Sequence, residues 1–143
     1  MAIKVYDANE VTVNFATRPI ESGFDDGEFC RIEQDNASFG AKQGTDGQVT
    51  RFKTNQDLTT VTIILMQSAE GNAILSALLN ADLLASNGAG VAPILIRDRQ
   101  GKSAFASPEA WITGPPKVAY GREPGAREWT IQCANPKRFD GGN

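Results

Sequence analysis

Short runs of alternating apolar and polar residues dominate the first half of the chain, and they are separated by Gly, Pro, Asn and Asp. In the run Glu10 to Phe15, the apolar residues Val11, Val13 and Phe15 fall on one face, which is the period-two pattern of a half-buried β-strand. We predict further strands at Phe29 to Gln34, Val49 to Lys53 and Leu58 to Met66.

The second half repeats this pattern. Its predicted strands are Pro93 to Arg97, Lys102 to Ala106, Ala110 to Thr113, Lys117 to Tyr120 and Arg127 to Ala134. Both halves together contain roughly nine short strands, which predicts a mainly β fold, a β-sandwich or barrel. We find no linker or internal repeat, so we expect residues 1–143 to form a single domain.

One α-helix, from about Ser68 to about Asn87, interrupts the strands. Ser68 is the predicted N-cap and Gly88 the predicted C-terminal stop. A broad apolar side is formed by Ile74, Leu75, Leu78, Leu79 and Leu83, while Leu84 lies beyond a narrow polar stripe and Asp82 within the apolar arc. Either more than its own sheet covers this helix, or its last turn frays.

Composition and charge agree with an ordinary globular domain. The 143 residues are 41% hydrophobic and 22% charged, and they are enough to bury a core. A net charge of -3 and a pI near 4.9 argue against a surface that wraps nucleic acid by neutralising phosphates. A wall that DNA slides past remains compatible with this charge.

Neither end of the chain nor its cysteines indicate export or a membrane. Met1 to Asp7 lack the apolar run of a secretion signal and begin a strand-like alternation. No stretch approaches the ~20 apolar residues that span a bilayer, so we expect no membrane embedding. Cys30 and Cys133 form no C-x-x-C pair, and we interpret them as buried free thiols rather than a disulfide or a metal site.

The residues that carry most enzyme chemistry are missing. The chain contains no histidine, which removes the Ser-His-Asp and Cys-His arrangements and most zinc sites. It has no phosphate-binding glycine motif of the G-x-x-x-x-G-K-[ST] type and no dinucleotide fingerprint. The paired acids of Asp25-Asp26-Gly27-Glu28 could bind a hard cation, but a solvated turn explains them better. We therefore expect no catalytic activity, no cofactor and no metal.

The segment Thr17 to Phe52 is hairpin-rich but poor in large apolar residues. A hairpin that buries little leaves unpaired edges, and pairing with identical neighbours would protect them. Copies joined in this way could close into rings, and rings that stack head to tail form a tube. A lone sandwich with a floppy hairpin is the alternative, and the pattern alone does not separate the two.

Several segments resemble the small tail tube proteins of contractile-tailed bacteriophages. They are DGQVTRFKTN (Asp46 to Asn55), AILSALLNAD (Ala73 to Asp82), GVAPILIRDRQGKS (Gly90 to Ser103) and the C-terminal stretch from AWITGPPKVAYG to KRFDGGN. The similarity covers most of the chain in the same order, and it is strongest from Asp46 onward.

This resemblance implies a β-barrel or sandwich with a flanking helix, assembled as hexameric rings that stack into a tube inside a contractile sheath. The implied partners are further copies of the chain, the sheath protein, and the tape-measure protein and transiting DNA in the lumen. The implied location is the tail of the virion. An extended hairpin usually reaches the adjacent ring in such families, and residues 38–57 are its best match here, with an inter-ring turn formed by Gly44, Thr45, Asp46 and Gly47.

The lumen of such a tube should be polar, with balanced or negative charge, so that DNA passes without being held. The alternation of the predicted strands offers five candidates for this wall, namely Arg31, Glu33, Arg51, Lys53 and Thr62. A shift of one residue in strand register would move all of them to the opposite face.

Other functions stay open at this level. The tube protein of a bacterial contractile injection or secretion device would share the fold. A carbohydrate-binding sandwich would need an exposed aromatic platform, which the scattered Trp111 and Trp129 do not suggest. A carboxylate-based hydrolase would need two facing acids in a cleft.

Overall fold

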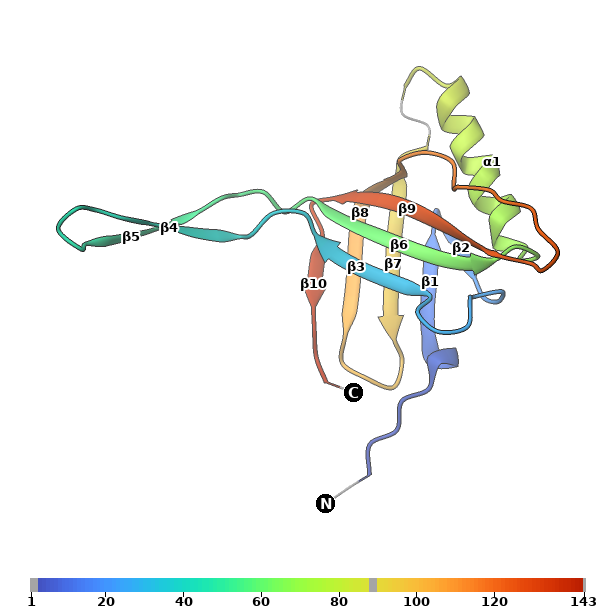
Figure 1. The fold of residues 1–143 in the computed structure, drawn as a ribbon, viewed down its shortest axis with the longest axis horizontal. Coiled ribbons are helices and arrows are strands. Elements are labelled where there is room, and N and C mark those ends of the chain that lie inside the picture. The colour runs from blue at the N-terminus through green and yellow to red at the C-terminus, as the bar shows by residue number, and fades with distance from the viewer. Residues whose placement is uncertain (1–2, 88–89, 143) are drawn as a thin grey trace.

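The computed structural model describes residues 3–87 and 90–142. Within them, ten strands and one α-helix confirm the predicted mainly β fold with a flanking helix (Figure 1). The strands are β1 (Val11–Phe15), β2 (Arg18–Ile20), β3 (Cys30–Gln34), β4 (Phe39–Gln43), β5 (Val49–Lys53), β6 (Thr59–Met66), β7 (Ala92–Asp98), β8 (Ala104–Ile112), β9 (Ala126–Ala134) and β10 (Lys137–Phe139). The helix is α1 (Gly71–Leu84), and a short 3-10 turn (Ala8–Glu10) precedes β1.

One antiparallel sheet contains all the strands except β4 and β5. Its order is β2-β1-β7-β8-β9-β6-β3, and β10 pairs with β8. On one edge, β8 pairs first with β10 through Ala104–Ala106 and then with β9 through Glu109–Ile112. Between these two pairings, the Ser107 hydroxyl donates to the carbonyl of Ala134 (2.7 Å). The strands β9, β6 and β3 therefore run across β1, β7 and β8, and the two parts face each other as layers (Figure 1).

The sheet does not close into a barrel in the described part of the chain, because it ends at β2 and β3. β2 has only three residues, and one of them is Pro19, which has no backbone N–H to donate. The described strands of a single chain therefore form a two-layer arrangement and no closed barrel.

One predicted strand is wrong. Lys117 to Tyr120 lies in the long connection between β8 and β9 and outside any strand. Pro115 and Pro116 precede it without backbone donors, and Val118 and Tyr120 are 46% and 79% exposed, so the segment has no face to bury. The predicted strands Lys102 to Ala106 and Ala110 to Thr113 belong to one strand, β8, which begins only at Ala104, continues through Pro108 and ends at Ile112.

The helix begins later than predicted. Ser68 lies in a turn after β6, and Glu70 is the N-cap, without a side-chain capping bond in the described structure. Glycine at the first helical position suits close packing, because a Cβ atom there would lie 3.0 Å from Cδ1 of Leu65. The predicted end at about Asn87 is wrong, since the helix ends at Leu84 and Ala85 has an extended backbone. The predicted stop residue, Gly88, lies outside the described residues.

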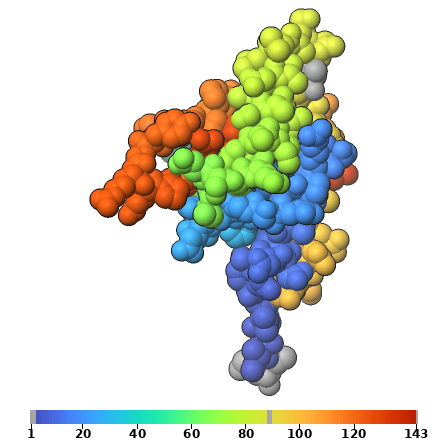
Figure 2. Space-filling view, turned by 90° about the vertical axis from the view of Figure 1, so that its right-hand side faces the viewer, coloured from blue at the N-terminus to red at the C-terminus, as the bar shows by residue number. Residues whose placement is uncertain are grey.

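The last turn of the helix is regular and does not fray, since the N–H of Ala85 still donates to the carbonyl of Ala81 (3.1 Å). Leu75 and Leu79 are buried, whereas Leu83 and Leu84 are 71% and 90% exposed. The helix therefore packs on the core as far as Leu79, and its last turn stands clear of the sheet (Figure 2).

The core lies between the two layers and under the helix. Its largest fully buried side chain is Trp129, which is 1% exposed. The indole Nε1–H of Trp129 donates to Oδ1 of Asn72 (2.9 Å). The side-chain amide of Asn72 donates in turn to the carbonyls of Met66 (2.9 Å) and Gln67 (3.3 Å). One buried amide thus joins the start of α1, the end of β6 and the middle of β9.

Replacing Asn72 with Ala should lower the free energy of unfolding by about 1–3 kcal/mol, because the buried indole N–H loses its acceptor and the carbonyls of Met66 and Gln67 each lose a donor. Asn80→Ala, on an exposed position of the same helix, is the matched control and should change stability by less than about 0.5 kcal/mol. Urea denaturation measures both. Equal effects of the two substitutions would show that the Asn72 bonds contribute nothing.

Candidate assembly surfaces

The outward side of β3, β6 and β9 forms a polar face. Strand register places Arg31 opposite Thr62 and Glu33 opposite Thr60. The same register places Thr62 opposite Thr130. Directly paired residues point to the same side of a sheet, so these side chains share one surface. We define the polar face by its members: Arg31, Glu33, Thr60, Thr62, Thr130 and Gln132.

The alternate residues of the same strands point inward. Val61, Ile63, Ile131 and Cys133 are 0% exposed. Burial of this inner side therefore determines which side of the three strands meets solvent. Three of the five predicted lumen residues, Arg31, Glu33 and Thr62, lie on the polar face.

Charge on the polar face is mixed. Arg31 forms an ion pair with Glu28, and the pKa of Arg31 is raised first by this hydrogen bond and then by the charge of Glu28. The hydroxyl of Thr60 donates to Oδ1 of Asp35 (2.7 Å). The face thus presents hydroxyls, one cation and the carboxylate of Glu33, and Glu28 and Asp35 are bound to two of its members, so the surface has little attraction for a polyanion.

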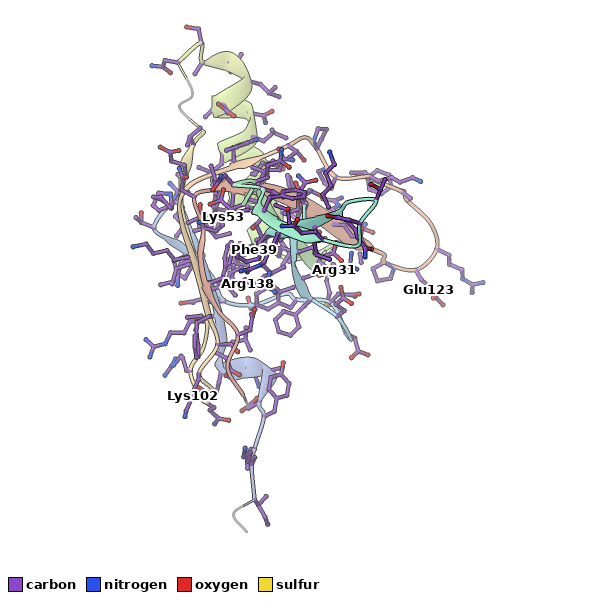
Figure 3. The ribbon with its side chains drawn as sticks, turned by 90° about the vertical axis from the view of Figure 1, so that its left-hand side faces the viewer. Arg31, Phe39, Lys53, Lys102, Glu123 and Arg138 are labelled. Atoms are coloured by element: carbon purple, nitrogen blue, oxygen red, sulfur yellow. The ribbon has the colours of Figure 1, made fainter. Side chains whose placement is uncertain are left out.

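Arg51 and Lys53, the other two candidates, lie away from the polar face on the hairpin of β4 and β5. This two-stranded sheet projects far from the body (Figure 1), and Figure 3 views it end-on, with Phe39 and Lys53 labelled. The guanidinium carbon of Arg51 lies 3.9 Å from the centroid of the Phe39 ring, a cation–π contact. On the other side of the hairpin, the Phe52 ring covers Gly40, where a Cβ atom would lie 2.4 Å from the ring.

The hairpin has little to bury against. Phe39, Val49 and Phe52 are 50%, 60% and 49% exposed. At its base, the N–H of Thr54 donates to the carbonyl of Ser38 (2.9 Å). Two-stranded hairpins are marginal on their own, so a surface outside this chain is needed to stabilise this one fully.

The tip of the hairpin is the predicted turn Gly44-Thr45-Asp46-Gly47. The N–H of Gly44 donates to the carbonyl of Gln48 (2.8 Å), and Oδ1 of Asp46 accepts from the N–H of Gln48 (3.0 Å). Gly47 has a φ of +89°, which L side chains rarely adopt. Glycine is thus required at this position by the backbone.

The remaining candidates take no part in a chemical site. Of the paired acids, Asp26 and Glu28 are exposed, as expected for a solvated turn, whereas Asp25 is half-buried and its N–H donates to the carbonyl of Ile64 (3.1 Å). No group of three or more Cys, Asp or Glu side chains in residues 3–87 and 90–142 is placed to hold a metal ion. Over the same residues, no helix is both long and apolar enough to cross a bilayer.

Both cysteines are free thiols, as predicted, but only Cys133 is fully buried and Cys30 is half-buried. Burial raises the pKa of Cys133 to about 12. Burial and then the charge of Glu28 raise the pKa of Cys30 to about 11.

Sequence reasoning missed a groove on the open side of the core. It lies beside β3 and is lined in part by Val11, Ile32, Ile96 and Phe105, with a volume of about 330 Å³. These residues come from four strands that are distant in the sequence, so no local pattern could have indicated the groove.

The fold is that of tube-type proteins from contractile devices. The chain aligns with a sheath/tube terminator of an extracellular contractile injection system (TM-score 0.63, 13% identity, 98% of this chain and 100% of that chain). It also aligns with a chain of the sheath-tube complex of such a system (TM-score 0.58, 14% identity, 94% and 91%). A third match is the tube-terminating cap of the anti-feeding prophage (TM-score 0.58, 10% identity, 97% and 94%).

Sequence comparison identifies the family. The family model of the bacteriophage PhiTE tail tube protein matches residues 21–139, and the chain belongs to this family. A relative from Pseudomonas phage KPP10, structural protein ORF10, is 29% identical over 143 residues, which cover 96% of this chain and 83% of the relative. The protein is therefore a structural component of a phage tail and not an enzyme.

Native thiols should react slowly with Ellman's reagent. A pKa of about 11 leaves Cys30 with a thiolate fraction at neutral pH roughly 100-fold below that of a thiol with the ordinary value of 9.0. Because the pKa is raised, reactivity should grow as pH rises, and Cys133 should react only on unfolding. Cys30→Ser and Cys133→Ser separate the two signals. A rapid native reaction in the Cys30→Ser variant would contradict the burial of Cys133.

Proposed function

We propose that this protein is the subunit of an inner tail tube, in which hexameric rings stack inside a contractile sheath and conduct DNA during ejection. Membership of a tail tube family supports the tube. The sixfold ring, the sheath around it, and the tape-measure protein and DNA within it are parts of the proposal.

The projecting hairpin is the observation that carries this proposal. It extends well beyond the two-layer body (Figure 1). Its apolar side chains are exposed on both of its sides. A second copy of the chain could cover these side chains and extend the unclosed sheet. A contact between the hairpin of one copy and a different surface of the next is heterologous, and such contacts generate rings or open stacks.

In the proposed tube, the polar face lines the lumen. Its threonines and its mixed charges, with Arg31 and Glu33 at the outer strand, suit a wall past which DNA slides. Arg51 and Lys53 would join this wall if the hairpin continued the lumen sheet alongside a neighbouring copy. Residues 38–57, with the turn at Gly44 to Gly47, would then provide the contact between copies.

A tube protein of a bacterial contractile injection device is the second candidate. The structural matches come from the anti-feeding prophage and an extracellular injection system, which favours a shared architecture. In that case the lumen would carry other cargo or none, and the assembly surfaces would be the same.

Negative-stain electron microscopy of the purified full chain tests the proposal directly. We expect sixfold rings, hollow tubes or both at high protein concentration. A species that remains strictly monomeric at high concentration would refute it.

Gly47→Val should abolish or strongly reduce tube formation while leaving the melting temperature of the monomer nearly unchanged. Valine at this positive φ costs on the order of 1–3 kcal/mol locally, and the hairpin contributes nothing to the described core. Gly121→Val, at an exposed loop glycine with an ordinary φ and open space around it in the described structure, is the control. Sedimentation and microscopy compare the two variants, and normal tubes from Gly47→Val would argue against a contact at the tip.

Glu33→Lys should leave assembly intact and slow DNA exit, because it adds positive charge to the proposed lumen wall. Glu33→Gln removes the negative charge without adding a positive one, and it should slow exit less. Phage particles that carry each variant can be compared by DNA release in vitro at low salt, where screening is weak. Wild-type rates for Glu33→Lys would place Glu33 outside the lumen.

A further inference from the structure

The residues before β1 form an exposed apolar segment. Ile3, Val5 and Tyr6 are 92%, 63% and 60% exposed, and they lie in an extended stretch without helix or strand. Figures 1 and 2 show this segment standing out from the body at the end opposite the helix. In an extended chain Ile3 and Val5 share one side and Lys4 takes the other. The segment lies before the range 21–139 that the family model matches.

The groove beside β3 fits such a segment. It lies where the sheet remains open: β3 pairs with β6 on one edge, and its other edge has no strand partner among the described residues. Ile32 of β3 lines one part of the groove, and Ile96 and Phe105 of the opposite layer line another. An added strand here would hydrogen-bond to the open edge of β3 and bury its apolar side on these residues.

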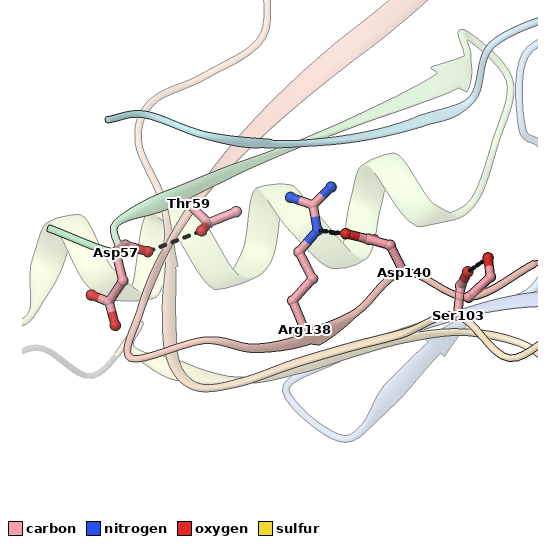
Figure 4. A network of polar contacts seen from close by, with 6 residues as sticks. Asp57, Thr59, Ser103, Arg138 and Asp140 are labelled. Atoms are coloured by element: carbon pink, nitrogen blue, oxygen red, sulfur yellow. Dashed lines mark hydrogen bonds and ion pairs between the residues drawn. The ribbon is translucent and has the colours of Figure 1, made fainter. Parts of the chain in front are cut away.

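The carboxylates that line the groove do not oppose the segment. Glu28, Asp98 and Asp140 are part of its described lining, which contains no Lys or Arg, and Glu28 is paired with Arg31. The C-terminal segment that carries Asp140 is held in place because Arg138 binds Asp140 (2.9 Å) and the hydroxyl of Ser103 donates to the carbonyl of Gly141 (2.9 Å) (Figure 4). Lys4 is the charged side chain of Ile3 to Tyr6, and with Ile3 and Val5 turned inward it falls on the outward side of an added strand, the side on which β3 carries Arg31 and Glu33.

We propose that residues Ile3 to Tyr6 of one copy bind in this groove of a neighbouring copy as an added strand along β3. Ile3 and Val5 face the apolar floor, and Lys4 lies on the outward side of the added strand, on the same side of the sheet as Glu33. Within its own chain, only Tyr6 of this segment reaches the groove, as part of its lining. The residues before Tyr6 run outward and leave the groove unfilled. This proposal rests on the assembly proposed above and assigns one of its contacts.

Disulfide trapping tests the contact, because the native Cys30 lines the groove. In Val5→Cys, a thiol on the inward side of the segment should come within bonding distance of Cys30 of the neighbouring copy. Mild oxidation of assembled full-length protein should then give a ladder of covalent oligomers on non-reducing gels. Lys4→Cys, on the opposite side of the strand, is the matched control and should give on the order of tenfold less dimer, since disulfides tolerate little misplacement. The double variant Val5→Cys with Cys30→Ser should give none through this contact.

The outcomes separate this contact from the assembly as a whole. Rings or tubes by microscopy without Val5→Cys cross-links would refute the strand addition and leave the tube intact. A disulfide within one chain, seen as a monomer of altered mobility, would also refute it, as would equal cross-linking of Lys4→Cys. If no oligomer of any kind forms, both proposals are refuted. As a second measurement, Val5→Asp should lower the assembled fraction without changing the melting temperature, because Val5 is exposed in the single chain.

Discussion

Trp129 lies at the centre of the core, where the two layers of the sheet cross, and its indole N–H is satisfied by Asn72. Because Asn72 also donates to the carbonyls at the end of β6, the start of the helix, β6 and β9 are held as one unit. β6 in turn carries β3, and the hairpin emerges between these two strands. The hairpin thus emerges from two strands that belong to the unit held by this buried contact.

Part of the apolar surface is buried within the single chain, and part remains exposed to solvent. The body buries a continuous core from both layers, whereas the hairpin, the end of the helix and the N-terminal segment keep large apolar side chains in solvent. All three exposed elements project from the body rather than lying on it (Figures 1 and 2). Such a division is expected of a subunit whose remaining surface becomes buried on assembly.

The alternating strands could be predicted because each has one buried and one exposed side, a pattern that a single sequence carries. The same pattern correctly placed Arg31, Glu33 and Thr62 on one surface. It could not show that Arg51 and Lys53 lie on a separate hairpin, because alternation reports the side of a strand and not the sheet to which it belongs. The predicted strand at Lys117 to Tyr120 is wrong for a related reason. Its residues alternate, but they pair with no strand in the described structure.

By itself the sequence determined the fold class, the tight turn at Gly47, the free state of both thiols and the absence of histidine chemistry, because these depend on residue type and short-range pattern. Tertiary structure decided that glycine stands at the start of the helix, since a side chain at position 71 would crowd Leu65. It also decided that the sheet stays open beside β3 in the described structure and that a largely apolar groove forms there. Those features arise from strands brought together across long separations, and no local pattern records which strands will meet.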